Sequence, residues 1–331
     1  MRSRFRRLSS LIVALVVIFG IVALPFVVRP ALQPAVDVAE EPGTASRVPT
    51  DRPSAGSNPP LTGETAFLIA AGDIASCDSF GDEQTAALVD QLEGTVAALG
   101  DTAYPHGRAA DFDECYEPTW GHFKERTRPV PGDHDYDTPG AAGYFDYFGD
   151  AAGARGQGYY SYDLGEWHVV ALNSNCRDVE GGCGFDSPQV GWLREDLAAS
   201  HGRCVLAYTF SPRFSSGRHG PDERLGPLVD VLHDARAAVL LSAHDHHYER
   251  FEPLDPEGYP DSVRGIRQFV VGTGGRSLRR VTTRTAGSEL DSSSSFGVLR
   301  LTLVPGEYAW EFIAADEGEF RDSGHAACTP T

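Results

Sequence analysis

The stretch TVAALGDTAY, residues 95–104, joins a short apolar run to a polar ending, and this combination predicts the core of the fold. Gly100 and Asp101 close the run, and Tyr104 follows three residues later. The run AFLIAAGD, residues 66–73, ends in the same way at Asp73. Apolar runs of this length that end in glycine and a polar residue are typical of buried strands. We therefore expect two core strands whose carboxyl ends each carry an aspartate.

Similar strand-length runs recur along the chain, and segments of helical spacing separate them. Strands are expected at 166–173, 203–209, 237–244 and 266–275, and a hairpin at 296–315. Helical patterns cover 82–93, 187–200 and 222–235. Ser187 and Pro188 have the residue types of a helix N-cap and first turn, whereas Pro227 interrupts the third pattern. Alternating strands and helices that end in a hairpin predict a layered α/β or α+β domain.

Composition limits the classes of partner. The chain has 331 residues, 41% of them hydrophobic, so it can fill a large core. Its net charge of −19 argues against binding DNA or RNA, because phosphate backbones require lysine and arginine partners. A small phosphorylated substrate in a metal-lined pocket remains compatible with this charge.

The N-terminal segment 1–29 predicts a membrane signal. Four arginines precede an uncharged run of 18 residues, 11–28. This length approaches a bilayer span, and the arginines predict a cytoplasmic N-terminus. No small-x-small cleavage site follows, so a single-pass anchor is favoured over a cleaved signal peptide. Residues 30–62 hold seven prolines and form the expected linker to a domain at 63–331. Both alternatives place that domain outside the cytoplasm, on the cell membrane or secreted.

The cysteines agree with export. There are six, an even number, and none forms a CxxC pair, so disulfides are expected rather than a zinc ribbon. Cys176 and Cys183 flank a glycine-rich loop and could close it locally. Six cysteines allow 15 connectivities. For the others we expect pairs 77–115 and 204–328.

Polar residues of metal-binding type gather where the strands are predicted to end. In layered α/β folds, ligands bind at the carboxyl ends of strands. The His-x-His pair after the run 237–242 would point both imidazoles the same way on an extended segment. Aspartate, tyrosine and histidine together form a ligand set that Fe(III), Zn or Mn accepts. The residues concerned are Asp73, Asp101, Tyr104, Asp133, His134, His244 and His246.

Four motifs in this order, GDIA, GDTAY, GDHD and AHDHHYER, resemble those of the calcineurin-like metallophosphoesterases, in the branch similar to purple acid phosphatases. The similarity extends from about residue 67 to 313. It implies a four-layer α/β/β/α sandwich with two metal ions at the strand ends. This branch often carries an Ig-like domain before the catalytic one, and we expect that domain to be absent here, because only the linker precedes the catalytic domain.

The resemblance also implies a role for each matching residue. Asp73, Tyr104 and His246 would bind the first metal, and Asp101 would bridge both. His244, with Asp133, would bind the second metal, and His134 would contact the substrate. The implied reaction is phosphate monoester hydrolysis by a hydroxide held between two Fe, Zn or Mn ions, and a tyrosinate favours Fe(III) in the first position.

The chain departs from the family pattern around the second metal. Asp133 replaces an asparagine ligand, Phe210 replaces a histidine ligand, and Ala243 replaces a glycine. Three alternatives follow. Asp133 compensates and a harder ion such as Mn or Mg binds with water; His219 or His247 supplies the missing imidazole; or the second site is empty.

These departures leave two functions open. The first is an extracytoplasmic metallophosphatase, a phosphoric ester hydrolase acting on small phosphorylated substrates. Its alternative is a catalytically impaired relative that keeps one metal and binds phosphorylated or anionic ligands, for which Phe210 is the main support. Arg213 and His219, in the loop after Phe210, would contact phosphate or else belong to a solvated loop. Asp135 is expected to hydrogen-bond His134 or to cap its loop.

Overall fold

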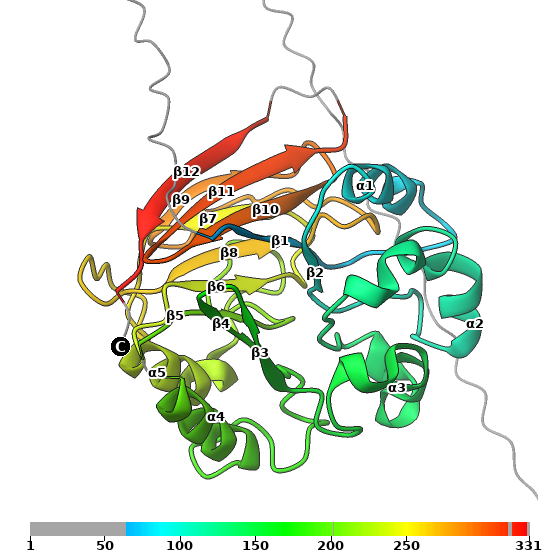
Figure 1. Ribbon diagram of the computed structural model, residues 1–331. Coiled ribbons are helices and arrows are strands. Elements are labelled where there is room, and N and C mark those ends of the chain that lie inside the picture. The colour runs from blue at the N-terminus through cyan, green and yellow to red at the C-terminus, as the bar shows by residue number, and fades with distance from the viewer. Residues whose placement is uncertain (1–63, 201, 317–319, 330–331) are drawn as a thin grey trace, which may run out of the picture. The chain divides into compact units, whose positions relative to one another are not determined.

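The computed structural model describes residues 64–200, 202–316 and 320–329 (Figure 1). The chain divides into two units, Met1–Gly56 and Ser57–Thr331, and all described residues belong to the second. The predicted membrane segment 1–29 and linker 30–62 lie outside the described residues. In the ranges that are described, no helix is both long and apolar enough to cross a bilayer.

Strands and helices alternate in the first two thirds of the domain, and strands dominate the remainder. The strands are β1 (Ala66–Ala71), β2 (Thr95–Ala98), β3 (Tyr160–Leu164), β4 (Trp167–Ala171), β5 (Cys204–Tyr208), β6 (Val239–Ser242), β7 (Tyr248–Phe251), β8 (Arg267–Val271), β9 (Ser288–Ser292), β10 (Gly297–Val304), β11 (Glu307–Ala314) and β12 (Asp322–Ala327). The α-helices are α1 (Gly81–Val89), α2 (Ala109–Asp111), α3 (Ala142–Phe148), α4 (Pro188–Ala199) and α5 (Gly226–Asp234).

The strands form two sheets. One has the order β12-β11-β10-β1-β2 and the other β3-β4-β5-β6-β8-β7-β9. Strand β1 pairs in parallel with β2, and β4, β5, β6 and β8 pair in parallel with their neighbours in that series. Because parallel strands end at the same edge, the loops after β1 and β2 meet at one edge and those after β4, β5, β6 and β8 at another.

Side-chain alternation along β5 shows how the layers are built. Leu206 and Tyr208 face a core shared with the first sheet, whereas Val205 and Ala207 face a second core formed with α4 and α5. Successive strand residues point to opposite faces, so one buried strand serves both cores. Helix α1 contacts β10 of the first sheet. The resulting layers of helix, sheet, sheet and helix agree with the predicted metallophosphoesterase sandwich (Figure 1).

Local details confirm several sequence predictions and correct one. The Ser187 hydroxyl caps α4 by accepting the Val190 N–H. Strands β10 and β11 form the predicted hairpin. Pro227 does not interrupt a helix; it lies in the first turn of α5, where a missing N–H costs no hydrogen bond.

All six cysteines are paired, and the pairs are those expected from the sequence. The disulfides join Cys77 to Cys115, Cys176 to Cys183, and Cys204 to Cys328. The last of these ties β5 to the end of β12.

Candidate metal centre

Three predicted ligands occupy strained backbone positions directly after strands. Asp73 follows β1 with a φ of 58°, Asp101 follows β2 with 49°, and His244 follows β6 with 67°. Residues other than glycine rarely adopt this left-handed conformation, and such strain concentrates at functional sites. The chain therefore uses unfavourable backbone geometry to turn these side chains toward one place.

Close packing of glycines lets these loops approach. A Cβ on Gly72 would lie 2.5 Å from the Cβ of Ala243, so the backbone of the loop after β1 lies directly against the Ala243 side chain in the loop after β6. A Cβ on Gly272 would lie 2.7 Å from Asp73 Oδ2. The carboxyl ends of the two sheets thus meet around Asp73.

The predicted first-metal residues converge into one buried cluster. The Tyr104 hydroxyl lies 2.8 Å from Asp73 Oδ1 and 2.7 Å from Asp101 Oδ2. His246 Nε2 lies 3.2 Å from Asp73 Oδ1. All four side chains are buried. The structure therefore brings together Asp73, Asp101, Tyr104 and His246 from the loops after three different strands.

The electrostatics of this cluster are unfavourable without a cation. Burial raises the pKa of Asp101 well above its ordinary value, and the charges of Asp133 and Asp73 raise it further. Burial would also raise the pKa of Asp73, but the adjacent His246 outweighs it and holds that pKa below normal. Burial and the two carboxylates raise the pKa of Tyr104 well above its ordinary value. A bound cation would reverse these costs because its charge favours the ionised ligands.

Two observations bear on whether a metal fits here. Asp73 Oδ2 is buried and has no hydrogen-bond partner, which is costly unless something positive binds it. Oxygens bound at right angles to one cation about 2.1 Å away would lie about 3 Å apart, close to the separations in this cluster. Within the described ranges, however, no group of three histidine, cysteine or acidic side chains is arranged as a ready-made cation site. The donor atoms of this cluster are of the types that bind a metal, and in this structure they contact one another.

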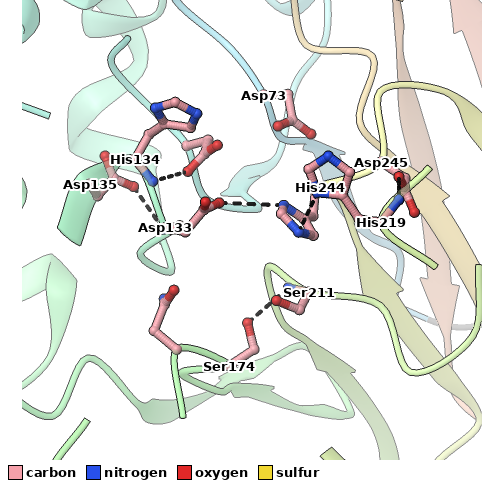
Figure 2. A network of polar contacts seen from close by, with 12 residues as sticks. Asp73, Asp133, His134, Asp135, Ser174, Ser211, His219, His244 and Asp245 are labelled. Carbon is pink, nitrogen blue, oxygen red and sulfur yellow. Dashed lines mark hydrogen bonds and ion pairs between the residues drawn. The ribbon is translucent and has the colours of Figure 1, made fainter. Parts of the chain in front are cut away.

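The predicted second-metal residues lie beside this cluster (Figure 2). Asp133 Oδ1 is 3.4 Å from His244 Nδ1. Burial would lower the pKa of His244, but the contact with Asp133 raises it above normal. Asp101 Oδ1 accepts the His134 N–H at 2.9 Å, so the bridging candidate also holds the loop that carries Asp133.

Phe210 forms an apolar wall at this second position. Its side chain is fully buried, and its ring centroid lies 4.8 Å from that of His244. A Cβ on Gly100 would meet the Phe210 ring at 2.5 Å, so the ring packs against the backbone next to Asp101. Phe210 thus occupies the neighbourhood of the predicted second-metal residues without contributing a donor atom.

Of the two histidines considered as substitutes, one lies at the site and the other does not. His219 Nδ1 lies 2.7 Å from His244 Nε2. His247 instead pairs with the buried Glu249, at 3.0 Å between Nε2 and Oε2. His247 therefore belongs to the core, and His219 is the imidazole available next to His244.

Asp245, which was not among the site residues predicted from the sequence, positions His219. Its buried carboxylate accepts the Ser215 hydroxyl at 2.5 Å, the His219 N–H at 2.9 Å and the Gly220 N–H at 3.2 Å. Figure 2 shows Asp245 beside His219. These bonds wrap the loop after β5 around the turn after β6. The signal available was an acid between two predicted ligands in the motif AHDHH.

His134 and Asp135 take separate roles in the loop after Pro131. The His134 ring packs on Tyr104, 4.6 Å between centroids, and its Nδ1 lies 2.7 Å from the Pro105 carbonyl oxygen. Because a carbonyl only accepts, Nδ1 carries the proton and Nε2 is left for other contacts. Asp135 caps the loop by accepting the Gly132 N–H at 2.8 Å. Burial raises its pKa to about 6.

Three arginines complete the surroundings. The Arg213 guanidinium donates to the Pro256 carbonyl oxygen and lies over the Phe214 ring, so its contact with phosphate stays a prediction. Arg276 and Arg279, which the sequence reading did not single out, lie at the site instead. Arg276 lies over the Tyr104 ring, and Arg279 Nη1 is 3.2 Å from His219 Nε2. The sequence signal was the basic run RSLRR after a glycine-rich strand end.

The fold and this cluster define a layered α/β protein with a metal-type ligand set at its strand ends. The model of the calcineurin-like phosphoesterase family matches residues 66–248, and the chain belongs to that family. Members are phosphoester hydrolases that generally bind two metal ions.

Among curated proteins, the chain is similar to purple acid phosphatases of Arabidopsis thaliana. It is 22% identical over 296 residues to "Probable inactive purple acid phosphatase 9", covering 71% of this chain and 44% of that protein. It is 29% identical over 162 residues to "Purple acid phosphatase 22", covering 46% and 35%. The chain thus spans less than half the length of these relatives.

Solved structures show the same fold at low identity. The purple acid phosphatase PPD1 from yellow lupin seeds superposes with a TM-score of 0.64 at 18% identity, covering 80% of this chain and 54% of that one. GAP50 of Plasmodium, described as the anchor in the inner membrane complex, gives 0.63 at 15%, covering 80% and 89%.

Proposed function

We propose that the chain is a metal-dependent phosphatase that acts outside the cytoplasm and hydrolyses phosphate monoesters. One observation carries the proposal: Asp73 is fully buried on a left-handed backbone, and one of its oxygens has no partner among the described residues. Tyr104 and His246 meet its other oxygen. A cation bound by this set would explain the buried charge and the strain together.

The residues divide into two sets of ligands. Asp73, Tyr104 and His246 would hold the first cation, Asp101 would be shared, and Asp133 with His244 would hold the second. Two cations of the Fe, Zn or Mn type supply Lewis-acid activation of water and of phosphoryl oxygens when bound. The burial of Asp101 and Asp73 keeps this chemistry in a region of low dielectric constant, where charge interactions are strong.

His134 is the residue best placed to handle a proton on the substrate. The Pro105 carbonyl holds its Nδ1 proton, so Nε2 is the atom that can bind a phosphoryl oxygen or protonate the leaving oxygen. Its ring rests on Tyr104, which keeps it next to the ligand cluster.

His219 would act by orienting His244. A guanidinium only donates hydrogen bonds, so the contact with Arg279 makes His219 Nε2 the acceptor and leaves the proton on Nδ1. That proton faces His244 Nε2, so a neutral His244 carries its own proton on Nδ1, toward Asp133. To bind a cation through Nδ1, His244 would carry its proton on Nε2 and donate it to His219 Nδ1, with His219 in its other tautomer and released from Arg279. His219 would orient His244 in this way, while Phe210 leaves the second site with fewer donors than the first.

The location outside the cytoplasm is supported by covalent chemistry. Three disulfides use every cysteine of the chain, as is typical of proteins that fold in oxidising compartments. The apolar N-terminal run would then anchor the chain in the cell membrane by a single pass, or direct its secretion.

A second candidate function rests on Phe210. With this ring buried at the second position, the chain would hold one cation and bind phosphorylated or anionic ligands without hydrolysing them.

Hydrolysis separates the two. The full-length chain, supplied in turn with Fe, Zn, Mn and Mg, is expected to hydrolyse an aryl phosphate monoester. Asp73→Asn should reduce this rate by at least about 100-fold, because a ligand is lost. A folded, metal-loaded chain that releases no phosphate would favour the binding protein.

A further inference from the structure

The segment 276–279 is bound directly to the loops that carry the predicted ligands. The Arg276 N–H donates to the Asp73 carbonyl oxygen at 2.9 Å, and the Arg279 N–H donates to that of His246 at 2.8 Å. The Ser277 hydroxyl lies 2.7 Å from His246 Nδ1. The two arginines are therefore placed by the same backbone that places the ligands.

Their side chains contact different residues of the site. The Arg276 guanidinium carbon is 5.1 Å from the centroid of the Tyr104 ring, whose hydroxyl contacts Asp73 and Asp101. Arg279 reaches His219, which contacts His244 on the side of the predicted second metal. One arginine thus lies next to each set of ligands.

The negative charge of the chain and of the predicted ligands indicates a role for these arginines. The chain carries a net charge of −19, and three of the predicted ligands are carboxylates gathered in one cluster. Such a surface repels a phosphoryl dianion at a distance, and bound cations offset only the charge beside them. Two guanidinium groups beside the cluster supply directional donors that match phosphoryl oxygens.

We propose that Arg276 and Arg279 form an arginine clip that binds the non-bridging oxygens of a phosphoryl dianion and selects phosphate monoesters over diesters. A monoester dianion presents three non-bridging oxygens and two charges, whereas a diester presents two oxygens and one charge. The selection rests on the proposed phosphatase function, while the binding of phosphate by the clip does not require turnover.

The kinetic test compares two substrates with matched variants. Arg276→Gln, Arg279→Gln and the double variant are assayed on an aryl phosphate monoester and on a bis-aryl phosphate diester. Arg280→Gln removes the same charge from an exposed neighbour and is the control. Arg276→Lys and Arg279→Lys test whether charge alone suffices.

Each clip variant should lower kcat/KM on the monoester by about 10- to 100-fold, the range for losing a charge-assisted hydrogen bond. Its effect on the diester should stay below about fivefold, and Arg280→Gln should change neither substrate by more than about twofold. Lysine should restore part of the monoester activity. An equal loss on both substrates would overturn the selection, because it would indicate misplaced ligands.

Binding of inorganic phosphate, measured by calorimetry on the metal-loaded chain, separates the clip from the phosphatase function. If wild type hydrolyses monoesters but the clip variants behave like Arg280→Gln, the clip is wrong and the phosphatase stands. If wild type hydrolyses nothing, the phosphatase is wrong. Phosphate affinity that falls about tenfold or more in the clip variants would then still support the clip, and unchanged affinity would overturn it.

Discussion

Replacing Phe210 by histidine restores the residue type that the family pattern has at this position. The Phe210 ring is fully buried, against His244 and the backbone of Gly100. Burying a phenylalanine side chain is worth about 1.5–3 kcal/mol, and a buried imidazole without a partner recovers little of this. In the presence of a chelator, Phe210→His should therefore lower Tm by roughly 4–8 °C.

With metal present, the same variant should recover. If the added imidazole raises the affinity of the second site tenfold, the stabilisation by excess cation increases by about 1.4 kcal/mol. Phe210→Leu is the matched control, because it also loses packing but adds no donor. The assay is Tm of wild type and both variants, in chelator and in Zn or Mn.

The reasoning would be refuted if metal stabilised Phe210→His no more than Phe210→Leu. Position 210 would then not face a second cation, whatever the family pattern suggests. A larger metal-dependent shift in Phe210→His alone would show that the scaffold of the second site is intact.

Three further changes test separate contacts. Tyr104→Phe removes the hydroxyl shared by two buried carboxylates and should lower the free energy of unfolding in chelator by about 2 kcal/mol; an unchanged urea midpoint would contradict this. His219→Ala should lower the affinity for the second cation by about 10- to 100-fold and leave the affinity for the first unchanged in calorimetric titrations. A second-site affinity equal to that of wild type would exclude the orienting role. Burial would lower the pKa of His168, but Asp196 and Asp163 raise it above normal. The stabilisation by these two ion pairs is complete below pH about 6.5 and is lost as pH rises through the raised folded-state pKa of His168. The difference in free energy of unfolding between wild type and His168→Gln, measured in urea, should therefore shrink over that pH range. A difference that stays constant with pH would show that the ion pairs are not its cause.

The sequence predicted the strands and the residues at their ends because both depend on local pattern. The apolar runs that end at Asp73 and Asp101 correspond to β1 and β2, with both aspartates at the carboxyl ends. The His-x-His pair follows β6 as expected. A ligand at the end of a buried strand follows an apolar run in the sequence, and this pattern can be recognised without knowing which strands lie beside it.

The site residues that could not be predicted from the sequence are brought to the site by the order of the strands in the sheet and by a long loop. Strand β8 lies beside β6 although β7 comes between them in the chain, so the loop with Arg276 and Arg279 returns to the turn of His244. His219 lies 25 residues before His244, and its position beside His244 depends on the bonds to Asp245 and on the contact with Arg279. Local pattern records neither the order of strands nor the path of a long loop.

The most direct test of the dinuclear phosphatase is a titration of the purified full-length chain with cation. Turnover of an aryl phosphate monoester is followed as Fe, Zn or Mn is added, and bound metal is counted in the same samples. The proposal predicts that activity rises with bound metal and saturates at about two ions per chain. A chain that binds at most one ion, or that binds two and releases no phosphate, would contradict it.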